Sequence, residues 1–514
     1  MKKFAKLLFS RMTLVGLAII AQVVFWVILY YLLSKNAYIS TAVNIIFSIL
    51  SLLFLFNVIN KNQQEVFKLP WVIIILVVPL FGIVIYTLFG RSPLSKKQIK
   101  HRRKVKEEIA KKVKVDDKAI TNLKKENLDA YGQSSYLTNV TSLPLCENTK
   151  TEYLSSGKNF YNKMLEILSK AEKYIMLEYF IVGEGKMLDG ILNILYEKVN
   201  ENVEVFLLFD DIGSLGRMST KKYLEIKKKG INIVIFNPFV PITSVVHNNR
   251  DHRKITVVDG KYGLVGGANI GDEYIDIDHP YGYWKDSAVF LEGNGVDSLV
   301  SIFAQNYNIA SKNHQIDIDN YLVKHEKMDS KGYLLPFGDG PAPIDVNHIG
   351  EDVFSNLIGC AKKSICITTP YLIVSYEFLH KLCLASKRGV DVKIITPYIP
   401  DKKITNILTK SNYQMLVESG VKIYEFEPGF IHAKNFIVDD IYGVCGTINL
   451  DYRSFVHHYE CGVWMYKCEA VKQMKDDFDQ MIENQTIFID EKKAKLPFFH
   501  RIIKVVINLF APLF

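Results

Sequence analysis

The stretch His252-Arg-Lys254-Ile-Thr-Val-Val-Asp259, followed by Gly266-Gly-Ala-Asn269, decides the fold because it occurs twice. The second copy reads His432-Ala-Lys434-Asn-Phe-Ile-Val-Asp439, followed by Gly446-Thr-Ile-Asn449. Both copies have the pattern H-x-K, four residues, D, six residues and G-x-x-N, and their histidines at 252 and 432 are 180 residues apart. Two copies with identical spacing indicate a duplicated structural unit.

The sequence around each copy repeats as well. Ala171-Glu-Lys-Tyr-Ile corresponds to Ala361-Lys-Lys-Ser-Ile, and Val203-Glu-Val corresponds to Val390-Asp-Val. Strand-like runs at 174–181, 203–209, 231–236 and 255–258 alternate with amphipathic helical stretches at 161–171 and 187–199, a pattern typical of α/β folds. We therefore expect two α/β lobes, each a mixed sheet flanked by helices, related by a pseudo-two-fold axis with a site at that axis.

The residue types in the motif suit chemistry at a phosphodiester. In H-x-K on a strand, the first and third residues point to the same face, so two copies would bring His252, Lys254, His432 and Lys434 around one centre. The lysines would neutralise the phosphate oxygens, one histidine would attack phosphorus, and the other would protonate the leaving alkoxide and later deprotonate the acceptor. We expect the Asn269 and Asn449 amides to bind the phosphate, and we expect no metal or other cofactor because the lysines supply the positive charge.

Four carboxylates accompany the motifs. Asp286 and Glu460 each begin a strand-like run after the asparagine, and we expect them to orient the histidines and hold their protons; ordinary charges at strand ends are the alternative. Asp259 and Asp439 are counted with the catalytic residues as part of the motif, although a strand end that leads into a turn also suits a loop brace.

The remaining histidines and the cysteines give weaker signals. His457 and His458 are expected to be structural or to line the pocket rim. The chain has seven cysteines, with no C-x-x-C pair and no spacing typical of a zinc site. Several lie within apolar runs, so we expect buried free thiols in a reducing compartment.

Three apolar stretches open the chain, at about 12–33, 42–58 and 71–89. Each approaches the ~20 residues that cross a bilayer and has no internal charge, so we expect transmembrane helices, the third kinked at Pro79. A cleaved signal peptide is the alternative for the first stretch, because Lys2, Lys3 and Lys6 precede it.

Basic residues bear on the membrane orientation. The lysines and arginines between 91 and 106 predict a cytoplasmic C-terminal part, but the arm before residue 12 is basic too. Three full spans cannot place both on one side, so either the N-terminus is outside or one stretch is re-entrant.

We divide the chain into a transmembrane region (1–92), a basic linker (93–150), a first lobe (151–325), a second lobe (326–490) and a C-terminal tail (491–514). In the tail, His500, Arg501, Lys504 and Asn508 share one helical stripe, which indicates an amphipathic helix at a membrane interface or a terminal helix packed on the domain. The formal net charge of +9 suits anionic lipid or nucleic acid.

Several segments carry a family resemblance. They are Leu177-Glu-Tyr-Phe-Ile, Asp210-Asp-Ile-Gly-Ser214, Arg250-Asp-His-Arg-Lys254, Gly266-Gly-Ala-Asn-Ile-Gly-Asp-Glu-Tyr274, Thr369-Pro-Tyr371, Arg388-Gly-Val-Asp-Val392, Pro428-Gly-Phe-Ile-His-Ala-Lys434 and Asn449-Leu-Asp-Tyr-Arg-Ser454. With the doubled motif they resemble the phospholipase D superfamily, and within it bacterial cardiolipin synthases, over nearly the whole chain. The sequence departs from the family in having three apolar stretches instead of the usual two spans, and in lacking the serine of G-S-x-N.

The resemblance implies duplicated phospholipase D-like lobes after N-terminal transmembrane helices, in a multi-pass protein of the cell membrane with its catalytic lobes in the cytoplasm. It implies a reversible transfer between two phosphatidylglycerol molecules that gives cardiolipin and glycerol through a phosphatidyl-histidine intermediate, without a metal. By similarity His252 is the nucleophile and His432 the acid, although the sequence does not separate these roles. The implied partners are phosphatidylglycerol and anionic membrane lipid, not nucleic acid.

Three alternatives stay open at this point. A hydrolase of the same superfamily, a phospholipase or a nuclease, would use the same histidines with water as the acceptor. A transferase could use another lipid or alcohol as the acceptor. A non-catalytic scaffold predicts decay of the motifs, yet both copies are complete.

Overall fold

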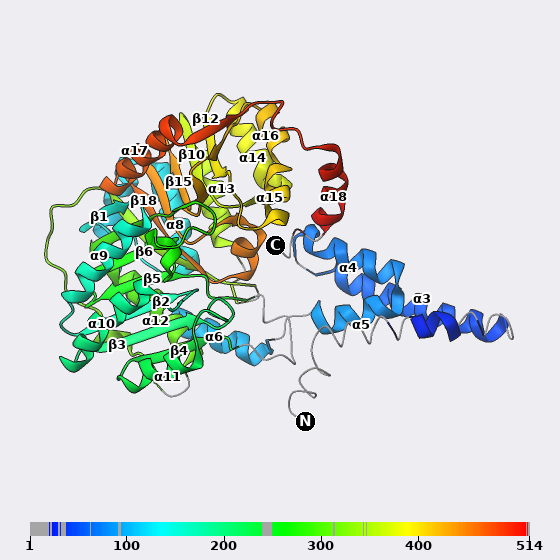
Figure 1. The fold of residues 1–514 in the computed structure, drawn as a ribbon, viewed down its shortest axis with the longest axis horizontal. Coiled ribbons are helices and arrows are strands. Elements are labelled where there is room, and N and C mark those ends of the chain that lie inside the picture. The colour runs from blue at the N-terminus through cyan, green and yellow to red at the C-terminus, as the bar shows by residue number, and fades with distance from the viewer. Residues whose placement is uncertain are drawn as a thin grey trace. The chain divides into compact units, whose positions relative to one another are not determined.

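The computed structural model describes residues 20, 23–28, 31, 37–61, 63–90, 94–238, 249–311, 314–342, 344–345, 347–509 and 511. Most of the expected span at 12–33 lies outside these residues. The chain divides into an N-terminal unit, chiefly Met1–Lys96, and an α/β unit made of Lys97–Pro238 and Asn249–Lys504 (Figure 1).

The first lobe is built on a seven-stranded mixed sheet. Its strand order is β1-β8-β6-β5-β2-β3-β4. The strands are β1 (Thr149–Leu154), β2 (Tyr174–Tyr179), β3 (Glu204–Asp210), β4 (Asn232–Phe236), β5 (Lys254–Val258), β6 (Tyr262–Gly266) and β8 (Ala288–Gly293). Strands β2, β3 and β4 are parallel, and the remaining pairs are antiparallel. The strands expected from hydrophobic pattern are present.

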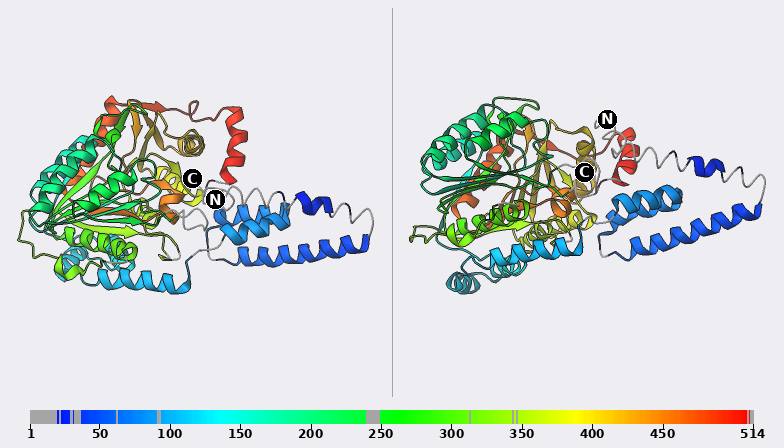
Figure 2. Two further views of the ribbon diagram at one scale, coloured as in Figure 1. Left: turned by 60° about the horizontal axis from the view of Figure 1, so that its bottom comes forward. Right: turned by 90° about the horizontal axis from the view of Figure 1, so that it is seen from below.

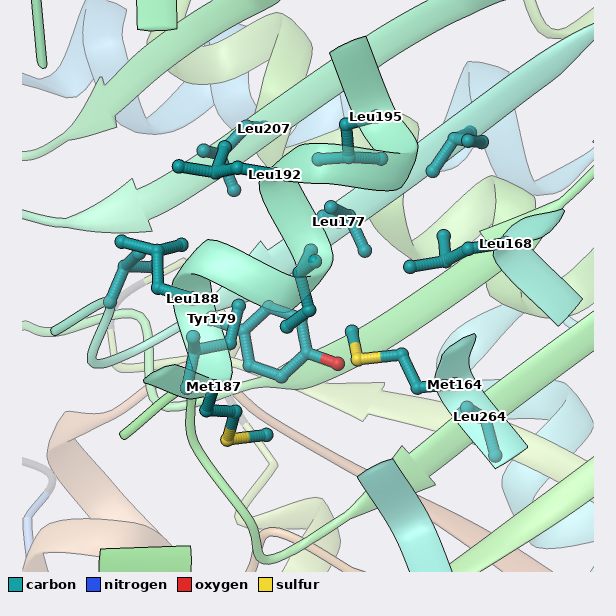
Figure 3. Close-up of a cluster of buried hydrophobic side chains, with 14 of the residues drawn as sticks. Met164, Leu168, Leu177, Tyr179, Met187, Leu188, Leu192, Leu195, Leu207 and Leu264 are labelled. Carbon is teal, nitrogen blue, oxygen red and sulfur yellow. The ribbon is translucent and has the colours of Figure 1, made fainter. Parts of the chain in front are cut away.

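Helices bury the apolar faces of this sheet. The helices are α9 (Gly157–Ser169), α10 (Lys186–Asn200), α11 (Thr220–Lys228) and α12 (Gly295–Ala310). Met164 of α9 and Leu192 of α10 pack with Leu177 and Leu207 of the sheet in one buried cluster (Figure 3). Helix α12 is buried along most of its length and packs against strands of both lobes, so it joins the two cores.

The second lobe repeats the first. Its eight strands follow the order β19-β13-β12-β10-β15-β16-β18-β9. They are β9 (Tyr333–Asp339), β10 (Ser364–Thr368), β12 (Asp391–Pro397), β13 (Lys422–Phe426), β15 (Asn435–Val438), β16 (Tyr442–Gly446), β18 (Glu460–Tyr466) and β19 (Thr486–Ile489), with helices α13 (Ile349–Cys360), α14 (Tyr376–Lys387), α15 (Lys403–Lys410), α16 (Tyr413–Glu418) and α17 (Glu469–Asn484). Read from β13 to β9, the order matches β4 to β1 of the first lobe, with β19 added at the edge. The predicted duplication of a mixed α/β lobe is confirmed.

Backbone pairing joins the lobes beside both motif histidines. Strand β7 (Tyr283–Lys285) of the first lobe pairs in parallel with β14 (Gly429–Ile431) of the second. Next to this pair the His432 N–H donates to the Lys285 carbonyl at 2.7 Å, and at the matching place the His252 N–H donates to the Tyr459 carbonyl at 2.9 Å. Each histidine is therefore fixed by the lobe that does not contain it.

In the segment 93–150, which we predicted to be a basic linker, the residues described from Leu94 onward are largely helical. It contains α6 (Lys96–Ala110), α7 (Asp117–Glu126) and α8 (Leu128–Thr141). The side chain of Arg102 donates to the Tyr459 hydroxyl at 3.0 Å, and the indole N–H of Trp464 donates to Gln133 at 2.9 Å. From Lys97 onward this segment is part of the α/β unit.

In the N-terminal unit the second and third apolar stretches take different forms. Helix α3 (Ala37–Ile59) contains the expected span at 42–58 and is the one helix in the described residues that is long and apolar enough to cross a membrane (Figure 2). The third stretch, expected as one span kinked at Pro79, is divided at Val78 into two helices, α4 (Glu65–Val77) and α5 (Pro79–Phe89).

The C-terminal tail contains the expected helix, α18 (Phe498–Leu509). Its first two side chains, Phe498 and Phe499, are 69% and 76% exposed. The ammonium group of Lys504 donates to the Ser411 carbonyl at 3.1 Å. Elsewhere, all seven cysteines are free thiols and all except the half-buried Cys360 are buried, as the sequence predicts.

Candidate active site

Crossed pairs of histidine and carboxylate form the centre of the site. The Nδ1 atom of His252 lies 2.9 and 3.0 Å from the two carboxylate oxygens of Glu460, and Nδ1 of His432 lies 2.6 Å from Oδ2 of Asp286. Because a carboxylate only accepts, Nδ1 is the donor and Nε2 carries the free lone pair. Each histidine is thus paired with a carboxylate of the other lobe.

The second residue of G-x-x-N differs between the lobes, and the difference has a local cause. In the second copy the Thr447 hydroxyl donates a short hydrogen bond to Glu460. In the first copy the position is Gly267, where a Cβ atom would lie 2.2 Å from Oδ1 of Asp286. The glycine therefore leaves room for the Asp286 carboxylate, which accepts instead from the Ser287 N–H at 2.8 Å.

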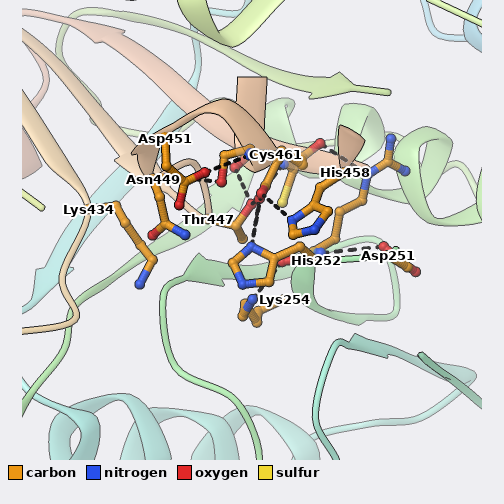
Figure 4. Close-up of polar contacts among 12 residues, drawn as sticks. Asp251, His252, Lys254, Lys434, Thr447, Asn449, Asp451, His458 and Cys461 are labelled. Atoms are coloured by element: carbon orange, nitrogen blue, oxygen red, sulfur yellow. Dashed lines mark hydrogen bonds and ion pairs between the residues drawn. The ribbon is translucent and has the colours of Figure 1, made fainter. Parts of the chain in front are cut away.

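The two motif lysines are buried beside the histidines. Lys254 and Lys434 are 1% and 4% exposed, and each ammonium group donates to the carbonyl of its own motif histidine. Figure 4 shows Lys434 and Asn449 of the second lobe in one group of polar side chains with His252 and Lys254 of the first. Burial lowers the pKa of Lys254 to about 7, with the charge of Lys434 adding to the effect, and burial lowers the pKa of Lys434 to about 8.

The same environment keeps both imidazoles neutral. Burial lowers the pKa of His252 well below its usual range, and the charges of Lys254 and Lys434 lower it further. Burial also lowers the pKa of His432, to about 4, although Asp286 acts in the opposite direction. Burial disfavours the ammonium forms of the two lysines, and a bound anion would favour them. The centre is therefore suited to an anion.

The two motif asparagines have unequal contacts. Asn269 accepts from the Ile181 N–H at 3.0 Å and donates to the Tyr274 hydroxyl at 2.7 Å. Asn449 is 5% exposed, and its Oδ1 atom has no hydrogen-bond partner among the residues that the structure describes. Both ends of the Asn269 amide are therefore in use, whereas Asn449 keeps an unpaired acceptor oxygen.

Asp259 and Asp439 lie away from this centre. The Asp259 carboxylate accepts three backbone N–H groups of residues 172–174 at 2.8 Å, and Asp439 accepts those of residues 362–364. Both have left-handed backbone, with φ of 53° and 54°, at the far end of β5 and β15, about 16 Å along the chain from each lysine. These contacts fit the alternative interpretation, in which both carboxylates brace a turn, and the catalytic assignment stays a prediction.

Arg253, the middle residue of the first H-x-K, had no predicted role. Its guanidinium group donates to three carbonyls, those of Glu460, Ile302 and Asp339, at 3.1 Å each. These bonds link the first motif to the start of β18 and to β9. Side chains alternate along a strand, so the Arg253 side chain is expected to face away from that of His252. Its three hydrogen bonds follow from that orientation.

His458 is closer to the centre than a rim residue would be. Its ring centroid lies 5.3 Å from that of His252, and its Nδ1 atom lies 3.5 Å from Oε1 of Glu460. Neither ring nitrogen has a hydrogen-bond partner in the described part of the chain. With His252 and Glu460 it forms a group whose ligand atoms lie within 4.8 Å of one another, but Glu460 already accepts from His252 and the nearby ammonium groups favour an anion.

Comparisons with known proteins agree with this geometry. A family model described as "Cardiolipin synthase, PLD-like domain" matches residues 164–291 and 354–482, and one described as "Phospholipase_D-nuclease N-terminal" matches 49–91. A cardiolipin synthase of Alkalihalophilus pseudofirmus is 32% identical over 88% of this chain and 90% of its own length. An uncharacterized protein of Streptococcus mutans is 38% identical over 88% of this chain and 98% of its own.

A solved structure shows the same fold. The phosphatidylserine synthase of Haemophilus influenzae superposes with a TM-score of 0.59 and 18% identity, covering 74% of this chain and 99% of its own. At this identity the likeness supports the fold of the two lobes and not a substrate.

The bracing role of Asp259 predicts a loss of stability. Asp259→Ala removes the acceptor of three N–H groups and places alanine at a positive φ, which together should cost about 2–4 kcal/mol. Thermal unfolding of the purified protein measures this loss, with Asp259→Asn expected in between and the exposed Asp278→Ala near wild type. An Asp259→Ala protein as stable as the parent would contradict the assignment.

Proposed function

Because the chain belongs to the cardiolipin synthase family with phospholipase D-like domains, we propose that it joins two phosphatidylglycerol molecules into cardiolipin and releases glycerol. As a member of this family the chain is a phosphatidyltransferase of the phospholipase D superfamily. The observation that carries the proposed reaction is the pair of crossed histidine–carboxylate contacts around two buried ammonium groups.

The donor phosphodiester binds first. Its negative charge is matched by the ammonium groups of Lys254 and Lys434, which are desolvated and held by the carbonyls of the motif histidines. The amide of Asn449 adds a hydrogen bond to the phosphate. Charge that builds on the phosphate oxygens in the transition state is stabilised by groups already in place, which is the largest electrostatic contribution that an enzyme site can make.

His252 and His432 divide the chemistry between them. The Nε2 lone pair of His252 forms a bond to phosphorus while the bond from phosphorus to the glycerol oxygen breaks, and His432 gives its proton to that oxygen. A hydroxyl of the second phosphatidylglycerol then gives its proton to His432 and attacks phosphorus, which frees His252. The second half-reaction is the reverse of the first with a different alcohol, so the transfer is reversible.

The electrostatics favour this assignment of roles. Burial and two lysines lower the pKa of His252 well below its usual range, which keeps it an unprotonated nucleophile. At His432 the carboxylate of Asp286 partly offsets burial, leaving a pKa of about 4, and a bound phosphodiester raises it further because an anion favours the imidazolium. His432 is therefore the histidine that is easier to protonate.

A defined-lipid assay tests the reaction. Purified protein in mixed micelles with phosphatidylglycerol alone should yield cardiolipin and glycerol in equal amounts, also in the presence of EDTA, because lysines supply the positive charge. Thin-layer chromatography of the lipids and an enzymatic glycerol assay measure both products. Phosphatidic acid as the sole lipid product would instead show a hydrolase.

Both histidines should be indispensable because nucleophile and acid act as one unit. His252→Ala and His432→Ala should each lower the turnover number by a factor of at least about 10³, whereas the surface variant His279→Ala should keep wild-type activity. Acid quenching of wild-type protein with radiolabelled donor should trap acid-labile lipid phosphate, and His252→Ala should trap none. Labelling of His252→Ala but not of His432→Ala would reverse the two roles.

The lysines predict a pH dependence of substrate capture. The pKa values of Lys254 and Lys434 are about 7 and about 8, so their ammonium forms are lost as the pH rises. Because kcat/KM reports the free enzyme, its value for the anionic donor should fall from about pH 7 upward. The bound anion favours the ammonium form, so kcat should fall only at higher pH. Lys254→Arg, which does not titrate in this range, should move the fall in kcat/KM upward; a kcat/KM constant from about pH 6.5 to about pH 9 would contradict this prediction.

A further inference from the structure

The third apolar stretch folds back on itself. The rings of Trp71 in α4 and Tyr86 in α5 meet edge to face with centroids 5.4 Å apart. In one continuous helix these residues would be separated by about 22 Å. Figures 1 and 2 show the two helices side by side, so the stretch is a helical hairpin.

The turn of the hairpin is built for a sharp reversal. Val78, with φ of −136° and ψ of 75°, is not helical, and Pro79 begins α5, where its missing N–H has no helical partner to lose. Gly82 allows the helices to touch, because a Cβ atom there would lie 2.6 Å from the carbonyl oxygen of Ile74. Ile75 and Tyr86 are 0% and 1% exposed in the seam.

Polar contacts close the open end of the hairpin against the end of α3. The ammonium group of Lys61 donates to the Gly90 carbonyl at 2.7 Å, 29 residues further along the chain. Lys68 donates to the Ile59 carbonyl at 3.0 Å and to Glu65 at 3.0 Å. The last turn of α3, the first turn of α4 and the last turn of α5 therefore lie at one level.

Length distinguishes the helix that spans from those that do not. Helix α3 has 23 residues, or about 35 Å, which exceeds a hydrocarbon core of about 30 Å. Helices α4 and α5 have 13 and 11 residues, or about 20 and 17 Å. Outward side chains such as Leu53 of α3 and Leu76 of α4 are 59% and 57% exposed, an apolar surface that suits acyl chains.

We propose that α4 and α5 form a re-entrant hairpin that enters and leaves the bilayer on the cytoplasmic side, and that only α3 crosses among these three helices. The acyl chains of the cytoplasmic leaflet surround the hairpin. Lys61, Lys68 and the basic segment 91–106 then share one side, as the distribution of lysine and arginine requires. The start of α3 at Ala37 then lies on the other side of the bilayer.

Cysteine accessibility tests the topology in cells that express the full chain. The chain has no cysteine before Cys146, so Ala37→Cys, Gln63→Cys and Ser95→Cys each introduce one thiol that is resolved by mass spectrometry of its peptide. A membrane-impermeant maleimide should label Ala37→Cys in intact cells, and Gln63→Cys and Ser95→Cys only after permeabilisation. A full span would place Gln63 and Ser95 on opposite sides, so labelling of Gln63→Cys from outside would overturn the proposal.

A cross-linking experiment tests the hairpin separately, in case a single cysteine at the bilayer surface disturbs insertion. Trp71→Cys with Tyr86→Cys should be joined within one chain by a short bis-maleimide, whereas the matched pair Leu53→Cys with Tyr86→Cys serves as a control for reagent access. A straight helix holds residues 71 and 86 beyond the reach of the reagent, so failure to cross-link a correctly inserted protein would overturn the hairpin.

Discussion

The contact on which the site depends is the hydrogen bond from each motif histidine to a carboxylate of the opposite lobe. His252 pairs with Glu460 and His432 with Asp286, and the backbone N–H of each histidine is held by the same opposite lobe. One lobe alone would contain a histidine without its carboxylate and a carboxylate without its histidine. Duplication therefore produces a site only when the copies dock, and the docking interface and the site are the same structure.

Charge balance explains why such a centre can be buried. The charges of the two lysines are matched by those of Asp286 and Glu460, and both imidazoles are neutral, as the lowered pKa values of the histidines indicate. A phosphodiester adds one negative charge, and a proton on His432 restores neutrality. Substrate binding and protonation of the acid are thus coupled by the cost of leaving any charge unpaired in a site with little water.

The sequence predicted the parts of the site and left their pairing open. Identical spacing of the H-x-K motifs was sufficient for the duplicated sheets, because strands and their register follow from local pattern. The pairing of each carboxylate with a histidine depends on how the lobes dock. The sequence around Asp286 and Glu460 does not predict that docking. Asp259 shared the spacing of the motif but belongs to the turn. For residues 71–89, a span and a hairpin have the same hydropathy, and Pro79 alone indicated the break.

The two lobes have diverged in the residues around the shared frame. Thr447 braces Glu460, whereas Gly267 leaves space for Asp286; Asn269 is bonded at both ends, whereas Oδ1 of Asn449 is not. In the proposed reaction the second half-reaction is the reverse of the first at the same phosphorus atom, which fits a frame that has stayed symmetric. The surroundings have no such constraint, since the two lipids of the proposed reaction take different roles. Asymmetry of the outer contacts therefore fits a symmetric reaction between two molecules in different roles.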